Sequence, residues 1–346
     1  MSHRLIADAP AQGYDINDYQ TGPQTLTAAA DIANMAAAGG NRSAANAVLA
    51  EIARVEAKGA VAGDDMTLTQ AMMATTVGGG QWNNLYERDG FHALSGLLNS
   101  STQNAANQPA QDKLFAGLVR SGGEGYVGGI DEGGNRGPAL DQLGTYFDRN
   151  VTRLAETDWR MDNTGDFHHG LVQDFTRNVM LDKDYGRIEQ SQEALTNEMT
   201  RLAVQVGDTN ADPQAREAAA STLGAIMGSL EQAGADYIAH AEGNAEAKVA
   251  FVRQFTDIVT DKLIGKLAEK IPEGEVRSGA TTAGGNFVDQ LWQKLVDHEK
   301  QVATGEVDKT TGGVLDLAQT IRTTMATGDA SLLNAFDLRV ELYYDN

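Results

Sequence analysis

Paired glycines divide an alanine-rich chain into segments, and this pattern constrains the fold more than any other feature. Glycine pairs or triplets stand at 39–40, 78–80, 122–123, 128–129, 133–134, 284–285 and 312–313. The whole chain of 346 residues includes about fifty alanines and only six prolines. Alanine is the best helix former and proline the worst, while paired glycines end helices. The sequence therefore predicts an all-α protein with about ten to thirteen helices in two lobes.

The apolar periodicity places these helices along the chain. We expect helices over 25–38, 43–57, 90–98, 111–119, 139–154, 167–180, 187–206, 213–240, 244–270, 286–303, 313–325 and 330–336. Beyond the last of them, apolar and polar residues alternate from Leu338 to Tyr344. Alternation with a period of two is typical of a strand, so a short C-terminal strand is expected there.

Composition shifts along the chain suggest three regions. Only Lys58 and Lys113 precede Lys183, so most lysines lie in the second half of the chain. We expect an irregular acidic leader over 1–22, an N-terminal helical region over 23–160 that includes a glycine-rich loop over 121–138, and a C-terminal helical domain over 161–346.

Charge and cysteine content exclude several classes of function. The chain carries 48 acidic and 27 basic side chains, a formal net charge of -21, and no cysteine. Without cysteine there are no disulfides, thiolate metal sites or cysteine nucleophiles. The acidic excess opposes binding to nucleic acids and anionic membranes. No cofactor is expected from any motif, and no apolar run is long enough for a stable membrane span.

The N-terminal residues lack the apolar segment of a Sec signal peptide. This fits a cytosolic protein, and it fits equally a protein that is cytoplasmic before export and is then secreted or injected by a route without such a signal.

The glycine-rich loop contains carboxylates that suggest one enzymatic hypothesis. Glycosidases use two carboxyl groups about 5–10 Å apart, one of them kept protonated by its surroundings. Glu124 paired with Asp131 or Glu132 would supply such a pair, and Tyr126 would line a sugar site. The alternative is that this segment is only a loop between helices.

A second group of polar residues suggests a metal hypothesis. Asp166, His168 and His169 lie close together in the sequence, and Asp174 follows about one turn later. Imidazole and carboxylate groups bind divalent metals, but no established metal-binding spacing is present. The alternative is that Asp166 caps the helix that follows.

Two further patterns have structural interpretations. Asp297, His298 and Glu299 are expected on a solvated helix face. Gly224 and Gly228 form a small-xxx-small pattern, which predicts close packing between soluble helices. A segment that inserts into a membrane after delivery would show the same pattern.

Two alanine- and glycine-rich stretches resemble a known class of protein. The segments 139–150 (ALDQLGTYFDRN) and 223–252 (LGAIMGSLEQAGADYIAHAEGNAEAKVAFV) are similar to helical regions of the polymorphic or contact-dependent secreted toxins and effectors of bacteria. The resemblance covers about 139–270 and includes no catalytic motif. It implies a bacterial protein exported without a Sec signal.

Three classes of function follow. The first is a helical module of a secreted effector that acts through protein–protein contacts, with a basic adaptor, chaperone or immunity protein as partner. The second is a muramidase-like glycosidase that uses the loop carboxylates. The third is a self-assembling structural subunit, since the sequence also permits an oligomer.

Overall fold

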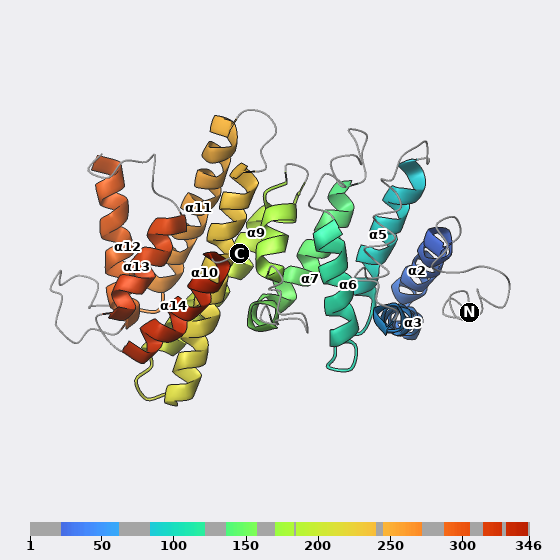
Figure 1. Cartoon of the computed structure of the whole chain (residues 1–346), viewed down its shortest axis with the longest axis horizontal. Coiled ribbons are helices and arrows are strands. Elements are labelled where there is room, and N and C mark those ends of the chain that lie inside the picture. The colour runs from blue at the N-terminus through green and yellow to red at the C-terminus, as the bar shows by residue number, and fades with distance from the viewer. Residues whose placement is uncertain are drawn as a thin grey trace. The chain divides into compact units, whose positions relative to one another are not determined.

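The computed structural model describes residues 22–61, 84–121, 136–157, 170–182, 185–239, 245–271, 287–304, 314–326 and 330–344. Within these ranges the chain forms twelve α-helices and one π-helix, with no strand (Figure 1). The prediction of an all-α multi-helix protein is confirmed. None of the described helices is both long and apolar enough to cross a lipid bilayer.

The chain divides into two compact units, each assembled from two stretches of sequence. Unit 1 comprises Met1–Arg149 and Asn178–Ile188, and unit 2 comprises Asn150–Arg177 and Glu189–Asn346. The chain crosses between the units three times, at 149–150 inside a continuous helix, at 177–178 and at 188–189. A change in composition along the chain cannot reveal this arrangement, because it registers only contiguous regions.

The helices of unit 1 follow the glycine punctuation. They are α2 (Gly22–Ala38), α3 (Ser43–Val61), α5 (Asn84–Ser100), α6 (Gln108–Ser121) and α7 (Arg136–Thr157), of which α7 continues into unit 2. The glycine pair after α2 ends that helix as predicted. Gly40 has a φ of 91° and donates to the carbonyl of Ala37, and Asn41 donates to the carbonyl of Ala36. These two bonds form a Schellman motif, which requires the left-handed conformation that glycine adopts at least cost.

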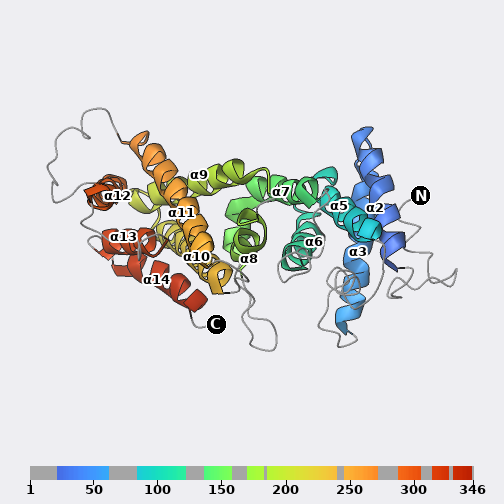
Figure 2. The same ribbon diagram turned by 90° about the horizontal axis from the view of Figure 1, so that it is seen from above.

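Small side chains bring α2 close to α3 and α5 (Figures 1 and 2). Ala29, Ala30 and Ala33 of α2 are fully buried. Asn34 donates from Nδ2 to the carbonyl oxygen of Ala93 on α5, 2.8 Å away. Gly96 leaves room for this amide, because a Cβ at that position would lie 2.6 Å from Asn34 Nδ2. The helices therefore approach through alanine and glycine, with one asparagine fixing the alignment.

Amide side chains order the connection between α5 and α6. Asn46 of α3 accepts from the Thr102 backbone amide at 2.7 Å and from Asn107 Nδ2 at 3.0 Å. Its own amide donates to Thr102 Oγ1 at 3.0 Å. The polar run that reads as a loop in the sequence is thus bonded to a helix more than fifty residues earlier, and the backbone amide of Thr102 finds its acceptor there.

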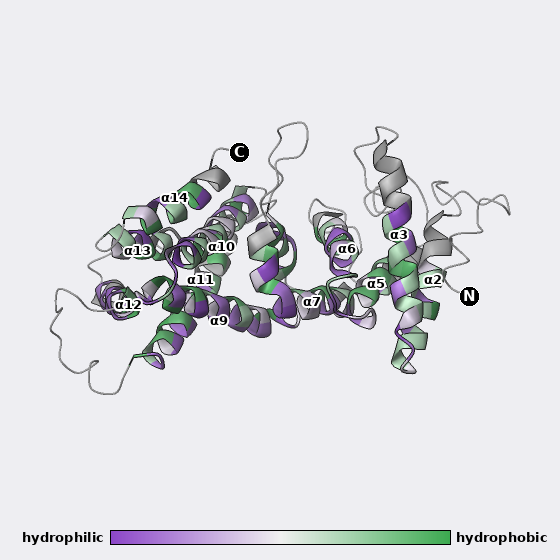
Figure 3. Cartoon of the chain, turned by 90° about the horizontal axis from the view of Figure 1, so that it is seen from below, coloured by the Kyte–Doolittle hydropathy of each residue, from purple (hydrophilic) through white to green (hydrophobic). Residues whose placement is uncertain are grey.

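The helices of unit 2 match the predicted positions closely, with two exceptions. They are α8 (Leu171–Phe175), the π-helix η2 (Thr176–Met180), which crosses into unit 1, α9 (Ile188–Gly207), α10 (Pro213–Ala239), α11 (Ala245–Ala268), α12 (Phe287–Thr304), α13 (Val314–Ala326) and α14 (Ala330–Tyr344). Proline at the first position of α10 has the expected role, since its missing amide hydrogen costs nothing there. Figure 3 shows polar and apolar residues alternating around α9 and α12, as expected of helices with one buried face.

Helix α10 forms the centre of unit 2 and packs against α8, α11, α13 and α14. Its residues from Thr222 to Glu231 are all buried. Gly224 faces the backbone of α14, where an added Cβ would overlap the carbonyl oxygen of Phe336 and lie 3.1 Å from Arg339 Cβ. The predicted close helix packing is confirmed at Gly224.

The predicted C-terminal strand is wrong. Residues 330–344 form one helix, α14, instead of a short helix followed by a strand. Leu332, Phe336 and Val340 are buried at steps of four residues, whereas Leu338 is 58% exposed. The alternation near the C-terminus is therefore the end of a helical stripe. It resembles a strand only when it is viewed without the preceding turn.

The second exception is the segment predicted as one α-helix over 167–180. Gly170 has extended backbone angles and precedes α8, and the helix changes to π geometry at Thr176. Gln173, Asp174 and Thr176 are each at most 2% exposed. Polar side chains thus occupy positions that are apolar in an ordinary buried helix, and their hydrogen bonds depend on partners elsewhere in the fold.

Candidate functional site

The residues that the sequence proposes for chemistry fall mostly outside the described part of the chain. This applies to the glycosidase candidates and to the metal candidates, namely Glu124, Asp131, Glu132, Asp166, His168 and His169. Both hypotheses therefore stay predictions. Among the described residues no group of three or more histidine and acidic side chains is arranged to hold a metal ion.

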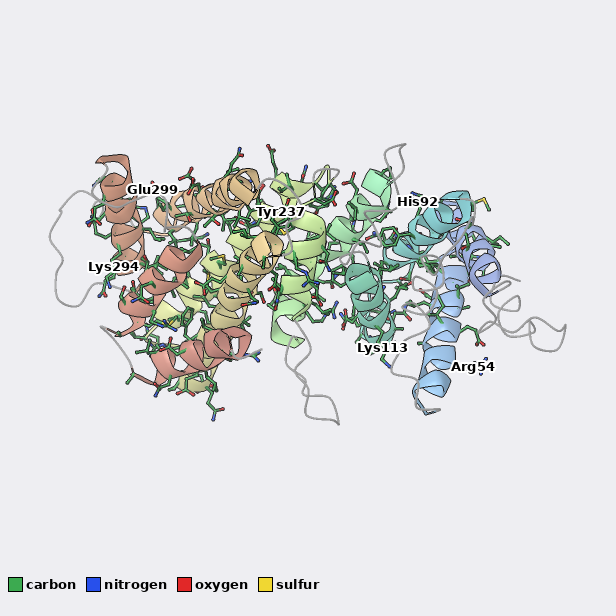
Figure 4. All side chains as sticks on the ribbon, turned by 45° about the horizontal axis from the view of Figure 1, so that its top comes forward. Arg54, His92, Lys113, Tyr237, Lys294 and Glu299 are labelled. Carbon is green, nitrogen blue, oxygen red and sulfur yellow. The ribbon has the colours of Figure 1, made fainter. Side chains whose placement is uncertain are left out.

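Two polar clusters stand out among the described residues of unit 2. The first surrounds Asp236 of α10. Its two carboxylate oxygens accept from Gln173 Nε2 at 3.0 Å and from Gln232 Nε2 at 2.9 Å, and Arg177 Nη1 lies 3.6 Å from Oδ2. Tyr237, labelled in Figure 4, is the next residue on α10 and is half-buried.

The Asp236 cluster connects three elements of secondary structure. Gln173 belongs to α8, Arg177 to the π-helix, and Gln232 and Asp236 to α10. π-helices occur frequently at functional sites. Here Arg177 of the π-helix meets a carboxylate whose oxygens already accept two hydrogen bonds. Such an arrangement positions helices and leaves the carboxylate little capacity to bind a further group.

The second group, which we name the carboxyl cluster, comprises Asp257 and Asp261 of α11 and Glu299 of α12. Asp257 and Asp261 are four residues apart and so lie on one face of α11. Glu299, labelled in Figure 4, is partly buried, whereas both aspartates are exposed. The hydrogen bond to Asp261, partial burial and the negative charges of Asp261 and Asp257 raise the pKa of Glu299 to about 7.

Three lysines with described side chains on α11 and α12 contact groups other than the carboxyl cluster. Lys262 Nζ donates to the carbonyl oxygen of Glu189 at 3.1 Å, and Lys266 Nζ lies 3.3 Å from Glu193 Oε1. Lys300 on α12 lies 3.6 Å from Asp297 Oδ1. These contacts hold the cations against α9 and the outer face of α12.

A carboxyl group with a pKa near 7 suits acid–base chemistry in general, but the arrangement does not suit glycoside hydrolysis. Glycosidases need about 5 to 10 Å between the carboxyl groups so that the glycosidic bond can lie between them. Asp261 raises the pKa of Glu299 through a hydrogen bond, which requires a shorter separation than that. The carboxyl cluster can therefore take up and release a proton near neutral pH, without space for a sugar between its members.

The sequence contains part of the signal for this cluster. Phe255, Val259 and Leu263 recur at steps of four residues and are buried, which fixes the exposed face of α11 and with it Asp257 and Asp261. Asp297 is exposed as expected of a solvated face, but Glu299 is not simply solvated. No local pattern shows that Glu299 meets a carboxylate, because its partner lies on another helix.

Comparisons with known proteins add no assignment. No family model matches the chain, and no match was found to a curated protein or to a solved structure.

Proposed function

We propose that this chain is a helical module of a secreted bacterial effector and acts through contacts with a basic protein. The observation that carries the proposal is the charge on the exposed surface of unit 2. Nine carboxylates are exposed among its described residues, against three cations, Arg201, Lys270 and Lys300. Arg201 and Lys300 are themselves paired, with Glu198 and Asp297.

An acidic surface of this kind favours one class of partner. Complementary charge accelerates the encounter with a basic protein and disfavours acidic partners and nucleic acids. The buried polar groups described above bond to neighbouring helices and so are consistent with structural roles. The resemblance of 139–270 to helical regions of secreted toxins and effectors suggests a basic adaptor, chaperone or immunity protein as the partner.

A capture experiment tests the proposal. The full chain, immobilised and exposed to a lysate of the organism that encodes it, is expected to retain a basic protein. The affinity of that purified protein should fall as salt rises from about 0.05 to 0.3 M, since salt screens the attraction. Expression of the chain in bacteria without the partner is expected to slow growth.

A charge variant shows whether the acidic surface is responsible. The triple variant Asp212→Asn, Glu217→Gln and Glu269→Gln removes three exposed charges, and asparagine keeps the helix-capping capacity at the start of α10. We expect weaker binding that depends less on salt. The matched control Gln190→Ala with Gln214→Ala alters exposed neutral residues and should bind as the wild type does. The proposal would be contradicted if the partner bound the wild type, the triple variant and the control equally. It would also be contradicted if the chain neither retained a partner nor slowed growth.

A cell-wall assay separates this proposal from the glycosidase hypothesis. The wild-type chain is expected to release no fragments from purified peptidoglycan, with or without the Glu124→Gln substitution. Release by the wild type that is lost in Glu124→Gln, with an unchanged circular dichroism spectrum, would establish the enzymatic alternative.

A further inference from the structure

The π-helix η2 contains a point at which the chain passes from unit 2 into unit 1. Arg177 is the last residue of one stretch of unit 2, and Asn178 is the first residue of the stretch of unit 1 that follows. Because one peptide bond joins the two residues, a contact made by either one constrains the backbone of the other.

In unit 2, Arg177 is held by the Asp236 cluster. Its Nη1 lies 3.6 Å from Asp236 Oδ2, and Gln173 Nε2 donates to the same oxygen at 3.0 Å. Gln173 precedes Arg177 by four residues, so both side chains reach α10 from one side of the helix. The side chains of Arg177 and Asp236 are 16% and 15% exposed, and water and salt screen such a pair less than an exposed one.

In unit 1, Asn178 caps the end of a helix. Its Nδ2 donates at 2.9 Å to the carbonyl oxygen of Val119 in a buried hydrogen bond. Val119 is among the last four residues of α6, whose carbonyl groups lack partners within the helix. Asn178 is 5% exposed and Val119 is fully buried, so loss of this bond takes a donor from a buried carbonyl group and destabilises the last turn of α6.

The segment η2 has a second conformation available, the ordinary α-helix. The Thr176 amide still donates to the carbonyl of Val172, four residues earlier, as in α geometry, and the helix changes at that residue. π geometry is rare, so contacts outside the segment must hold it. Each residue of an α-helix turns the chain through a larger angle than a π residue does. A return to α geometry therefore rotates Asn178 away from Val119.

We propose that η2 couples the two units: the contact of Arg177 with Asp236 keeps η2 in π geometry, and in that geometry Asn178 caps α6. Loss of the contact on α10 releases η2 and withdraws the cap. The coupling is reciprocal, so loss of the cap also weakens the contact on α10. It does not depend on the function proposed above. It makes the last turn of α6 in unit 1 respond to any partner that disturbs Asp236 in unit 2.

Amide hydrogen exchange of the full chain tests the coupling. Arg177→Met removes the cation and keeps a long side chain, and peptides that cover the last turn of α6 should lose about two- to tenfold in protection. The matched control Arg322→Met removes the cation that pairs with Asp337, also in unit 2, and should leave α6 as protected as in the wild type. Unchanged protection of α6 in Arg177→Met, or an equal loss in both variants, would overturn the coupling.

A substitution in unit 1 tests the reverse direction. Asn178→Ala removes the cap, and peptides of α10 that contain Asp236 should lose about two- to tenfold in protection. The control Gln103→Ala removes a similar bond near the end of α5, in which Gln103 Nε2 donates to the carbonyl oxygen of Leu98 at 2.6 Å. This control should leave α10 unchanged. A loss confined to α6 in Asn178→Ala, or the same loss of protection of α10 in Gln103→Ala, would contradict a reciprocal coupling.

A measurement on the wild type covers the case in which these variants do not fold. During exchange at low denaturant concentrations, peptides of the last turn of α6, of η2 and of α10 around Asp236 should open together. They should share one opening free energy and one dependence on denaturant, both smaller than those of global unfolding. Separate openings of these segments, or exchange through global unfolding alone, would show that η2 does not couple the units.

Discussion

At Gly224 a side chain is excluded by the backbone of another helix. An added methyl group would overlap the carbonyl oxygen of Phe336, which cannot rotate away as a side chain can. Gly265 of α11 shows the opposite situation, since nothing lies within 4 Å of the position a Cβ would take. Both glycines sit inside helices, where alanine is intrinsically preferred by about 1 kcal/mol. The sequence around each glycine does not distinguish the two positions, but the atoms that surround each one in the folded chain do.

Alanine substitutions at these two glycines should have opposite effects on stability. Gly224→Ala is expected to lower the free energy of unfolding by about 1–3 kcal/mol, because overpacking outweighs the gain in helix propensity. Gly265→Ala should raise it by up to about 1 kcal/mol. Urea denaturation followed by circular dichroism measures both. Equal stabilisation by the two substitutions would show that α10 and α14 are not in backbone contact at Gly224.

A second prediction at the residue scale concerns Asn46. Its side chain makes three hydrogen bonds to Thr102 and Asn107, so Asn46→Ala leaves the backbone amide of Thr102 without its acceptor and removes one of the two acceptors of Asn107 Nδ2. We expect a loss of about 2–4 kcal/mol in unfolding free energy. The control Asn197→Ala alters an exposed asparagine of α9 and should change stability by less than about 0.5 kcal/mol. If both variants unfold at the same urea concentration, the connection between α5 and α6 is not held by Asn46.

At the scale of elements, helices are fixed by polar contacts that cross from one to the next. Asp236 connects α10 to α8 and η2, and Arg322 connects α13 to Asp337 of α14. The carboxyl cluster differs from these pairs because it joins groups of like charge. Its contribution to stability must therefore change with pH, whereas an acid–base pair of ordinary pKa is constant around neutrality.

The sign of this pH dependence follows from the pKa of Glu299. That pKa is raised from 4.5 to about 7 in the folded chain, so between these values the folded state binds more protons than the unfolded state. The contribution is fully present below pH 4.5, falls as the pH rises toward 7, and is lost above 7. Because Glu299 is only partly buried, water screens its interactions with the aspartates. We therefore expect a loss of unfolding free energy on the order of 1 kcal/mol. The measurement is the difference in unfolding free energy between wild type and Glu299→Gln from pH 5 to pH 8, and a difference that stays constant would contradict the assignment.

For the whole molecule, the net charge of -21 has the widest effect. Charges of one sign repel each other most when the chain is compact, and this repulsion lowers the stability of the folded state at low ionic strength. Under the function proposed above, the same acidic excess favours a basic partner. In that proposal stability and recognition depend on one property, the net charge.

Salt should stabilise this protein. Raising sodium chloride from about 0.02 to 0.3 M is expected to increase the midpoint of thermal unfolding by about 2–4 °C, since screening shortens the range of the repulsion. The triple variant at Asp212, Glu217 and Glu269 should respond less. A midpoint that falls with salt in the wild type would mean that attractive ion pairs outweigh the repulsion.

The sequence by itself determined the helices and their buried faces. Alanine content, glycine pairs and Pro213 act within a few residues, so the helix ends were predictable to within a few positions over most of the chain. Only the tertiary structure decided that α14 continues to Tyr344, that the chain adopts π geometry at Thr176, and that Glu299 meets Asp261. These features depend on contacts between residues far apart in the sequence. A local pattern specifies which face of a helix is buried and does not specify what that face will touch.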